Sequence, residues 1–153
     1  MRRWSVYLSG EIHSDWRARI AEGVAVADLP VDLTGPVTDH EASDRCGVAL
    51  LGEERDAFWV DHKGARVNAL RTRTLLADAD LLVVRFGPRY KQWNAAFDAG
   101  QAAALGKPYV VLHDPELTHA LKEVDAAALA VAQHPEQIVA LLAYVVRGEL
   151  PPA

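Results

Sequence analysis

Cysteine is almost absent from this chain of 153 residues, which carries only Cys46. One cysteine cannot close an internal disulfide, and no CxxC, HExxH or similar spacing of metal ligands accompanies it. The six histidines are scattered along the chain instead of being grouped. We therefore expect neither a disulfide framework nor a metal site, and the low cysteine content agrees with a cytoplasmic protein.

Long hydrophobic runs are absent as well. No stretch approaches the roughly 20 apolar residues that a membrane-spanning helix needs. The two arginines near the start precede an apolar run that ends at Gly10 and Glu11, and this run is too short for the hydrophobic region of a signal peptide. We expect a cytoplasmic chain with no membrane partner.

An excess of basic charge is also missing. The formal net charge is −5 and the pI is near 5.6, so the chain has no electrostatic footprint for binding DNA or RNA. Glycine-rich phosphate loops of the GxGxxG and GxxxxGK types are absent, which argues against a dinucleotide cofactor and against a P-loop ATPase. A small-molecule partner, with no cofactor and no nucleic acid, is the expectation that remains.

What the chain does contain is an alternation of short apolar runs with helical patterns. Its length suits one domain over residues 1–148, followed by a frayed tail at 149–153. Strands are predicted at Trp4–Ser9, Pro30–Gly35, Asp80–Gly87, Tyr109–Leu112 and Ala127–Ala132. Helices are predicted at Asp15–Val26, at Ala65–Ala77, from Gln92 to the stop at Gly106-Lys107-Pro108, briefly up to Glu123, and after His134. Residues 38–45 fit an extended loop or a short helix, and residues 47–63 have no assignment.

Strands that alternate with helices imply parallel βαβ units with right-handed crossovers. We predict an α/β protein with a flavodoxin-like doubly wound parallel sheet of five strands and helices on both faces. In that topology the switch point lies between the first and third strands. The carboxyl ends of these strands, Tyr7–His13 and Phe86–Tyr90, should line one crevice together with the first turns of the helix that follows the third strand.

Asp98 lies among small apolar residues in that helix. Asn94, Asp98 and Gln101 fall on one helix face because they are four and three residues apart. Two interpretations are open. Either the face is a solvated polar stripe on an alanine-rich helix, or Asp98 is a nucleophile or general base whose pKa is tuned by partial burial.

The segment Gly10–Arg17 joins the first strand to the first helix. A strand-to-helix turn with a helix cap accounts for Gly10 and Ser14. It does not account for Glu11 and His13, which alternate at the exit of the strand. We predict that these two side chains project into the crevice and act there as acid or base.

Further candidates come from the strands and helices around the crevice. Tyr7 either packs its ring in the first strand or uses its hydroxyl to orient a carboxylate such as Asp98. Arg71 either pairs with Asp78 or Asp80 or holds an anionic group of the substrate. The predicted substrate-binding residues are Gly10, Gly87, Trp93, Asn94, Asn68 and Arg71.

Several of these motifs occur together in one known family. The chain resembles the uncharacterised bacterial YtoQ family at Tyr7–Arg17, Gly35-Pro36, Phe86-Gly87 and Tyr90–Asn94, and the match runs over nearly the whole length. More distantly, it resembles the nucleoside 2-deoxyribosyltransferases and the related nucleotide N-glycosidases. That resemblance implies the same flavodoxin-like fold.

The resemblance to the transferases also implies roles for residues. Ala95–Gly100, followed by Gly106-Lys107-Pro108, matches the segment that carries their nucleophilic Glu. Asp98 therefore takes the place of the nucleophile, and Tyr7 that of the tyrosine that orients it. Asp98 is about one methylene shorter than Glu, and reacting groups tolerate only small misplacement.

A second difference concerns the proton donor. The transferases carry an Asp after an Asn or Arg in the helix before the central strand, whereas this chain has Asn68 followed by Ala69. Glu11 or His13 is our hypothesis for the missing acid.

The chemistry that the resemblance implies is attack by the Asp98 carboxylate on C1′ of a nucleoside or nucleotide, as in retaining glycosidases. Another base or water then resolves the glycosyl-enzyme. The alternative is a non-catalytic nucleotide-binding or sensor domain with the same fold and pocket, and a third hypothesis is another type of hydrolase that uses Glu11, His13 and Asp98 together. By analogy with the transferases, we also expect a homodimer or a higher homo-oligomer.

Overall fold

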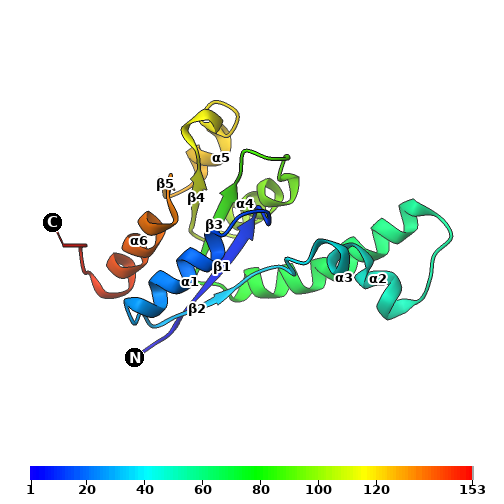
Figure 1. Ribbon diagram of the computed structural model, residues 1–153, viewed down its shortest axis with the longest axis horizontal. Coiled ribbons are helices and arrows are strands. Elements are labelled where there is room, and N and C mark those ends of the chain that lie inside the picture. Colours follow the sequence, from blue (N-terminus) through cyan, green and yellow to red (C-terminus); the bar gives the residue numbers. More distant parts are fainter. Residues whose placement is uncertain (153) are drawn as a thin grey trace. The chain divides into compact units, whose positions relative to one another are not determined.

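The computed structural model of the protein describes residues 1–152 (Figure 1). Its five strands are β1 (Trp4–Gly10), β2 (Val31–Thr34), β3 (Leu81–Phe86), β4 (Tyr109–His113) and β5 (Ala130–Ala132). They form one sheet in the order β2-β1-β3-β4-β5, and every neighbouring pair is parallel. This order confirms the predicted doubly wound α/β fold, in which the switch point lies between β1 and β3.

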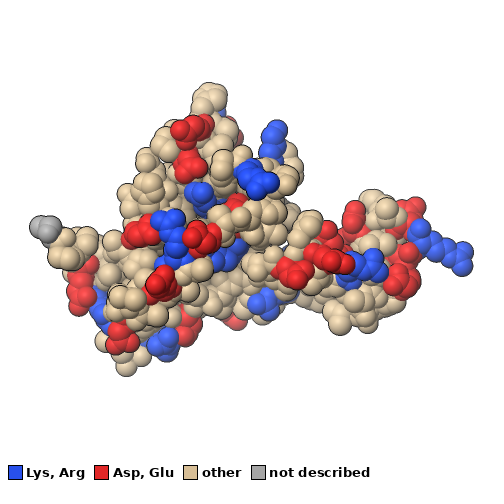
Figure 2. Space-filling view, in the orientation of Figure 1, with Lys and Arg blue, Asp and Glu red and all other residues tan. Residues whose placement is uncertain are grey.

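The α-helices are α1 (Trp16–Val26), α2 (His40–Leu51), α3 (Ala57–Asp78), α4 (Trp93–Ala104), α5 (Lys122–Ala127) and α6 (Pro135–Arg147), and a short 3-10 helix lies at Pro115–Leu117. The chain divides into two compact units. The first unit consists of Met1–Thr34 with the chain from Ala79 onward and holds the sheet, whereas the second is Gly35–Asp78. On the face seen in Figure 2, acidic and basic side chains are interspersed over the surface of each unit.

One face of the sheet packs against α1 and α6. Side chains alternate between the two faces of a strand, so Val6 and Leu8 point to the same side as Leu81 and Val83 in the neighbouring strand. These residues form the main hydrophobic core together with Trp16, Ile20 and Val24 from α1 and Ile138 and Leu142 from α6. The core therefore anchors α1 directly after the carboxyl end of β1.

The other face of the sheet lies against α4 and α5. Small residues of α4, namely Ala95, Ala99 and Ala102, are buried there and let the helix approach β1, β3 and β4 closely. The Tyr109 hydroxyl donates a hydrogen bond to the carbonyl of Val124 in α5 at 2.6 Å. This face carries the second side-chain set of β1, which is Ser5, Tyr7 and Ser9.

The second unit is a pair of packed helices, α2 and α3. A Cβ added to Gly47 would lie 2.6 Å from the backbone nitrogen of Gly64, so the helices approach each other where both residues lack side chains. Asp39 caps α2 by accepting a hydrogen bond from the Ala42 amide at 2.9 Å. Several large apolar side chains of this unit are exposed: Leu50, Leu51, Phe58, Trp59 and Leu70.

Several local expectations differ from the structure. The fifth strand begins at Ala130, whereas Ala127, its predicted start, is the last residue of α5. The polar segment 38–45 is the start of a full helix, α2, and the unassigned residues 47–63 contain its end and the first turns of α3. The cap predicted at Ser14 is wrong, because α1 has Asp15 at its N-cap position and the Ser14 hydroxyl donates instead to Glu11. Ser14 is thus used to shape the turn before the helix.

Candidate active site

Asp98 is a buried carboxyl group on the face of α4 that packs against the sheet. Only 8% of the residue is exposed, and its Oδ2 accepts a hydrogen bond from the Ser9 hydroxyl at 2.6 Å. Burial raises the pKa of Asp98 above its usual value, and the hydrogen bond from Ser9 lowers it in part. The solvated-stripe interpretation of this face is therefore wrong for Asp98, because the side chain points inward at the end of β1.

Tyr7 lies two residues before Ser9 and shares its face of β1. Its side chain is fully buried. The Ser9 hydroxyl donates a hydrogen bond to the Asp98 carboxyl group. An orienting role for Tyr7 stays a prediction, whereas Ser9 is a site residue that the sequence interpretation missed.

Glu11 is also buried, with 4% of its surface exposed, in the turn between β1 and α1. One carboxylate oxygen accepts the His13 amide and the other accepts the Ser14 hydroxyl at 2.6 Å. Its side chain fills the space beside Gly87, where an added Cβ would lie 2.6 Å from the Glu11 Cγ. Glu11 thus lies between the ends of β1 and β3, with both oxygens engaged by its own turn.

Arg17 holds this turn from the helix side. Its guanidinium donates hydrogen bonds to the carbonyls of Leu8, Gly10 and Glu11 at 3.0, 3.2 and 2.6 Å. Burial lowers the pKa of this guanidinium to about 10. Gly10 itself has φ of +113°, and a Cβ there would meet the Arg85 carbonyl oxygen at 2.1 Å, so the strand exit requires glycine at this position.

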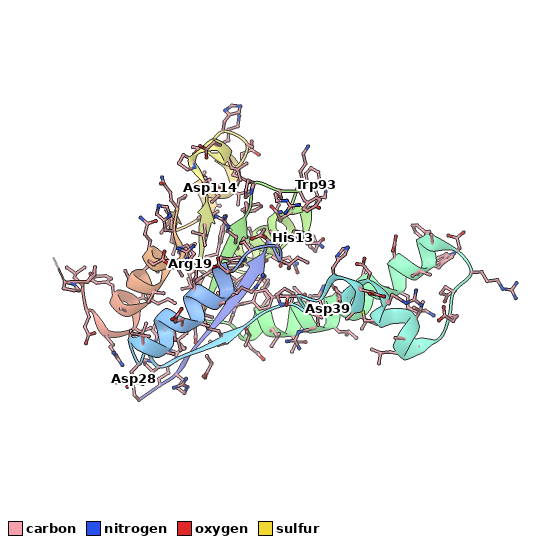
Figure 3. All side chains as sticks on the ribbon, in the orientation of Figure 1. His13, Arg19, Asp28, Asp39, Trp93 and Asp114 are labelled. Atoms are coloured by element: carbon pink, nitrogen blue, oxygen red, sulfur yellow. The ribbon has the colours of Figure 1, made fainter. Side chains whose placement is uncertain are left out.

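His13 lies on the exposed side of the same turn (Figure 3). Its ring meets that of Tyr90, from the loop after β3, with 4.8 Å between centroids. Tyr90 has a left-handed backbone with φ of +64°, which is uncommon for a residue other than glycine and is often found at functional sites. The two rings join the loops at the carboxyl ends of β1 and β3.

Three predicted substrate residues, Gly87, Trp93 and Asn94, lie between the end of β3 and the first turn of α4. The Gly87 amide donates to Oε1 of Gln92 at 3.1 Å, which closes the loop before α4. Trp93 and Asn94, in the first turn of α4, are both exposed. The Lys91 ammonium lies 5.4 Å from the centre of a Trp93 ring. Trp93 therefore presents an aromatic surface to solvent at the start of the helix that carries Asp98.

Asn68 and Arg71 belong to the second unit, on α3. The Asn68 amide donates to the Ser43 carbonyl at 3.0 Å, and the Arg71 Nε donates to the Gly35 carbonyl at 3.1 Å. The predicted pairing of Arg71 with an aspartate is wrong, because Arg71 forms no ion pair with any residue in 1–152. Substrate binding by these two residues stays a prediction.

Two residues of the site went unnoticed in the sequence. Ser9 has the same face as Tyr7 by simple alternation, and this spacing is the signal that would have found it. Arg17 gives no such signal, because a charged residue in the first turn of a helix is ordinary. Residues 1–152 contain no group of three or more His, Cys, Asp or Glu side chains that could hold a metal ion. None of the helices in this range has the length and apolar character of a membrane span.

Comparison with known proteins places this chain in a family. The family model described as nucleoside 2-deoxyribosyltransferase YtoQ matches residues 7–146. The chain belongs to this YtoQ family. The uncharacterised protein YtoQ of Bacillus subtilis (strain 168) is 38% identical over 144 residues, which cover 94% of this chain and 97% of the relative. The resemblance predicted from the motifs is confirmed.

Solved structures share the fold of this YtoQ family member. A conserved protein from Enterococcus faecalis V583 superimposes with a TM-score of 0.62 at 17% identity, covering 92% of this chain and 98% of that one. A 2-deoxyribosyltransferase from Bacillus psychrosaccharolyticus superimposes with a TM-score of 0.54 at 16% identity, covering 88% and 90%. At these identities the likeness establishes the architecture.

Proposed function

We propose that the protein cleaves the N-glycosidic bond of a nucleoside or nucleotide, with the Asp98 carboxylate as the nucleophile. The observation that carries this proposal is a buried carboxyl group, bonded to Ser9 at 2.6 Å, in the helix that follows the central strand. Ligands bind beyond the carboxyl ends of the strands in open α/β sheets, near the switch point. Membership of a nucleoside 2-deoxyribosyltransferase family supports the same class of reaction.

The reaction proceeds in two steps. An Asp98 oxygen forms a bond to C1′ as the bond between C1′ and the base nitrogen breaks, and the electron pair leaves with the base. An acid protonates that nitrogen. Water or a second base then attacks C1′, releases the Asp98 carboxylate and gives hydrolysis or transfer.

His13 is the proposed acid that protonates the departing base. The residue is exposed at the carboxyl end of β1, and its ring contacts that of Tyr90. Both oxygens of Glu11 already accept hydrogen bonds from the turn, which suits a carboxylate that shapes the site. Trp93 supplies an exposed aromatic face on which a planar base can stack.

Release of free base tests the proposal. The protein is incubated with a panel of deoxynucleosides, ribonucleosides, their 5′-monophosphates and NAD, and free base is measured by chromatography. We expect release from at least one substrate, and Asp98→Ala should lower its rate by about a thousandfold or more. Phe97→Ala, which changes an exposed neighbour on the same helix, is the matched control. Release that is unchanged by Asp98→Ala would overturn the assignment of the nucleophile.

A non-catalytic nucleotide sensor is the second candidate. The observation that favours it is Ala69, which stands where the related transferases carry their acid. A sensor should be stabilised against heat by a nucleotide that it leaves intact. Stabilisation without release of base, in the same panel, would favour the sensor over the enzyme.

We also propose that the protein forms a homo-oligomer. The second unit supports this, because it exposes Phe58, Trp59 and Leu70 at 63%, 52% and 72% and has a groove of about 420 Å³ beside Trp59. Exposed apolar patches of this kind mark interaction surfaces. Light scattering after size exclusion should give a mass above that of one chain, and Leu70→Glu should reduce it. A monomer at micromolar concentration would contradict the proposal.

A further inference from the structure

Gln92 lies at the N-cap position of α4, but its side chain does not cap that helix. Both ends of its carboxamide instead bind backbone groups of the preceding loop, residues 87–92. Oε1 accepts a hydrogen bond from the Gly87 amide at 3.1 Å, and Nε2 donates one to the Arg89 carbonyl at 2.8 Å. A neutral carboxamide carries an acceptor and a donor, and here each of them is used within the loop.

The hydrogen bond to the Arg89 carbonyl acts directly on Tyr90. That carbonyl belongs to the planar peptide unit between Arg89 and Tyr90, so holding it fixes the plane from which the φ angle of Tyr90 is measured. This φ is +64°, in a region that residues other than glycine seldom adopt. Such a backbone conformation persists only where the surrounding structure determines it, and the side chain of Gln92 supplies that restraint.

Tyr90 in turn meets the ring of His13. The ring centroids are 4.8 Å apart and the ring planes are inclined by 48°. Tyr90 is 67% exposed, so the hydrophobic core does not hold its side chain. The place of its ring beside His13 therefore depends on the backbone of the loop, which Gln92 restrains.

The backbone of His13 is connected to the same loop through Glu11. Gly87, whose amide is bonded to Gln92, lies against Glu11, since an added Cβ would be 2.6 Å from the Glu11 Cγ. The Glu11 carboxylate accepts a hydrogen bond from the His13 amide. The loop thus reaches the ring of His13 through Tyr90 and its amide through Glu11.

We infer that Gln92 is a positioning residue for the imidazole of His13. It orients the peptide unit before Tyr90 and so holds the Tyr90 ring against that of His13. The inference rests on the proposed function, in which His13 protonates the departing base, and Gln92 itself contacts no reacting atom. A displaced acid slows the departure of the base but leaves the Asp98 carboxylate able to attack.

Nuclear Overhauser contacts between the ring protons of His13 and Tyr90 test the positioning without any substrate. We expect them in the original chain and expect their loss in Gln92→Met, which keeps the length of the side chain without its donor or acceptor. Gln92→Glu keeps an acceptor, but at neutral pH it has no donor for the Arg89 carbonyl, so it should lose the contacts too. Gln133→Met, a change of an exposed glutamine outside the loop, should retain them.

The two Gln92 variants guard each other, because either one decides the matter if the other does not fold. Contacts that persist in a folded variant of Gln92, or that are missing from the original chain, would overturn the inference.

The rate of base release tests the consequence for catalysis. Gln92→Met should lower kcat for the best nucleoside or nucleotide substrate by about tenfold or more, with KM changed by less than about threefold. The para-nitrophenyl glycoside of the same sugar releases a phenolate that needs no proton, so its kcat should fall by less than about threefold. Equal losses with the two leaving groups would overturn the inference, because a merely structural role would slow both.

Tyr90→Ala shows whether Gln92 acts through Tyr90. It should lower kcat for base release about as much as Gln92→Met does, and the double variant should be no slower than either single variant. Losses that multiply in the double variant would contradict the inference. Failure of the original chain to release any base would count against the proposed cleavage, whereas the ring contacts decide the positioning of His13 independently.

Discussion

The hydroxyl of Ser9 in β1 donates a 2.6 Å hydrogen bond to Oδ2 of Asp98 in α4. This bond joins the first strand to the helix after the third strand, across the switch point of the sheet. Burial raises the pKa of Asp98, and the bond from Ser9 opposes that rise because it favours the charged form. Ser9 is thus a positioning residue whose hydrogen bond also favours the charged form of the carboxyl group.

Substitution of Ser9 by Ala should raise the pKa of Asp98 further. The variant loses the donor that stabilises the carboxylate while the burial stays the same. Carbon-13 NMR of the Asp98 carboxyl carbon, followed against pH, measures this directly. Ser14→Ala is the control, because that hydroxyl bonds Glu11 instead. If Ser9→Ala leaves the titration midpoint of Asp98 unchanged, the hydrogen bond from Ser9 does not affect the pKa of that carboxyl group.

Replacement of Asp98 by Asn should stabilise the protein at pH 7. The pKa of Asp98 is higher in the folded chain than in the unfolded chain, so the folded state holds its proton longer. The contribution of Asp98 to the free energy of unfolding is therefore lost as pH rises from the ordinary carboxyl pKa of 3.8 through the raised pKa of the folded chain. This loss persists at neutral pH. Urea unfolding should show an advantage for the variant that shrinks as pH falls towards 3.8. An advantage that is constant with pH would contradict this origin.

Gly10→Ala should destabilise the protein by about 3 kcal/mol or more. The new Cβ would be strained at φ of +113° and would meet the Arg85 carbonyl oxygen at 2.1 Å. Gly100→Ala is the matched control, because a Cβ on this helical glycine meets nothing within 4 Å. It should stabilise the helix by about 0.5–1 kcal/mol. Similar unfolding free energies for the two variants would contradict the account of the β1 exit.

His113 and Asp125 form a buried pair that fixes α5 to β4. The ring nitrogens of His113 lie 2.7 Å from the Asp114 carbonyl oxygen and 2.8 Å from Oδ2 of Asp125. The Asp125 carboxylate is an acceptor, so removing it leaves the buried His113 ring without this partner. Asp125→Ala should cost about 2–3 kcal/mol of unfolding free energy. The exposed His119→Gln should cost no more than about 0.5 kcal/mol, and an equal loss in both would refute the role of the pair.

Much of the fold was predictable from local patterns. Apolar runs bounded by turn residues located all five strands, and their alternation with helices implied the parallel order β2-β1-β3-β4-β5. These features depend on hydrophobic periodicity, which a single sequence expresses directly. The sequence left open whether Asp98 faces solvent or the sheet, and the structure shows that it is buried against the sheet.

The rest depended on contacts that periodicity does not express. In α2 and α3 many large apolar side chains are exposed, among them Phe58 and Trp59, so the helical stripe was weak before Ala65. The hydrogen-bond donor to Asp98 is Ser9, which lies 89 residues away in the sequence. Engagement of Glu11 by the His13 amide and Ser14 depends on the turn geometry that Gly10 permits. Contacts between residues that are far apart in the sequence leave no local pattern from which they could be predicted.

The most direct test of the central claim is capture of the glycosyl-enzyme on Asp98. A 2-fluoro-2-deoxy nucleoside slows both steps, because the fluorine destabilises their oxocarbenium-like transition states. A base that leaves readily keeps the first step faster than the second, so the glycosyl-enzyme accumulates. Mass spectrometry of the intact protein and its peptides should show one added sugar on the peptide that contains Asp98, and none after Asp98→Asn. A sugar on another residue, or release of base with no adduct under these conditions, would contradict the account.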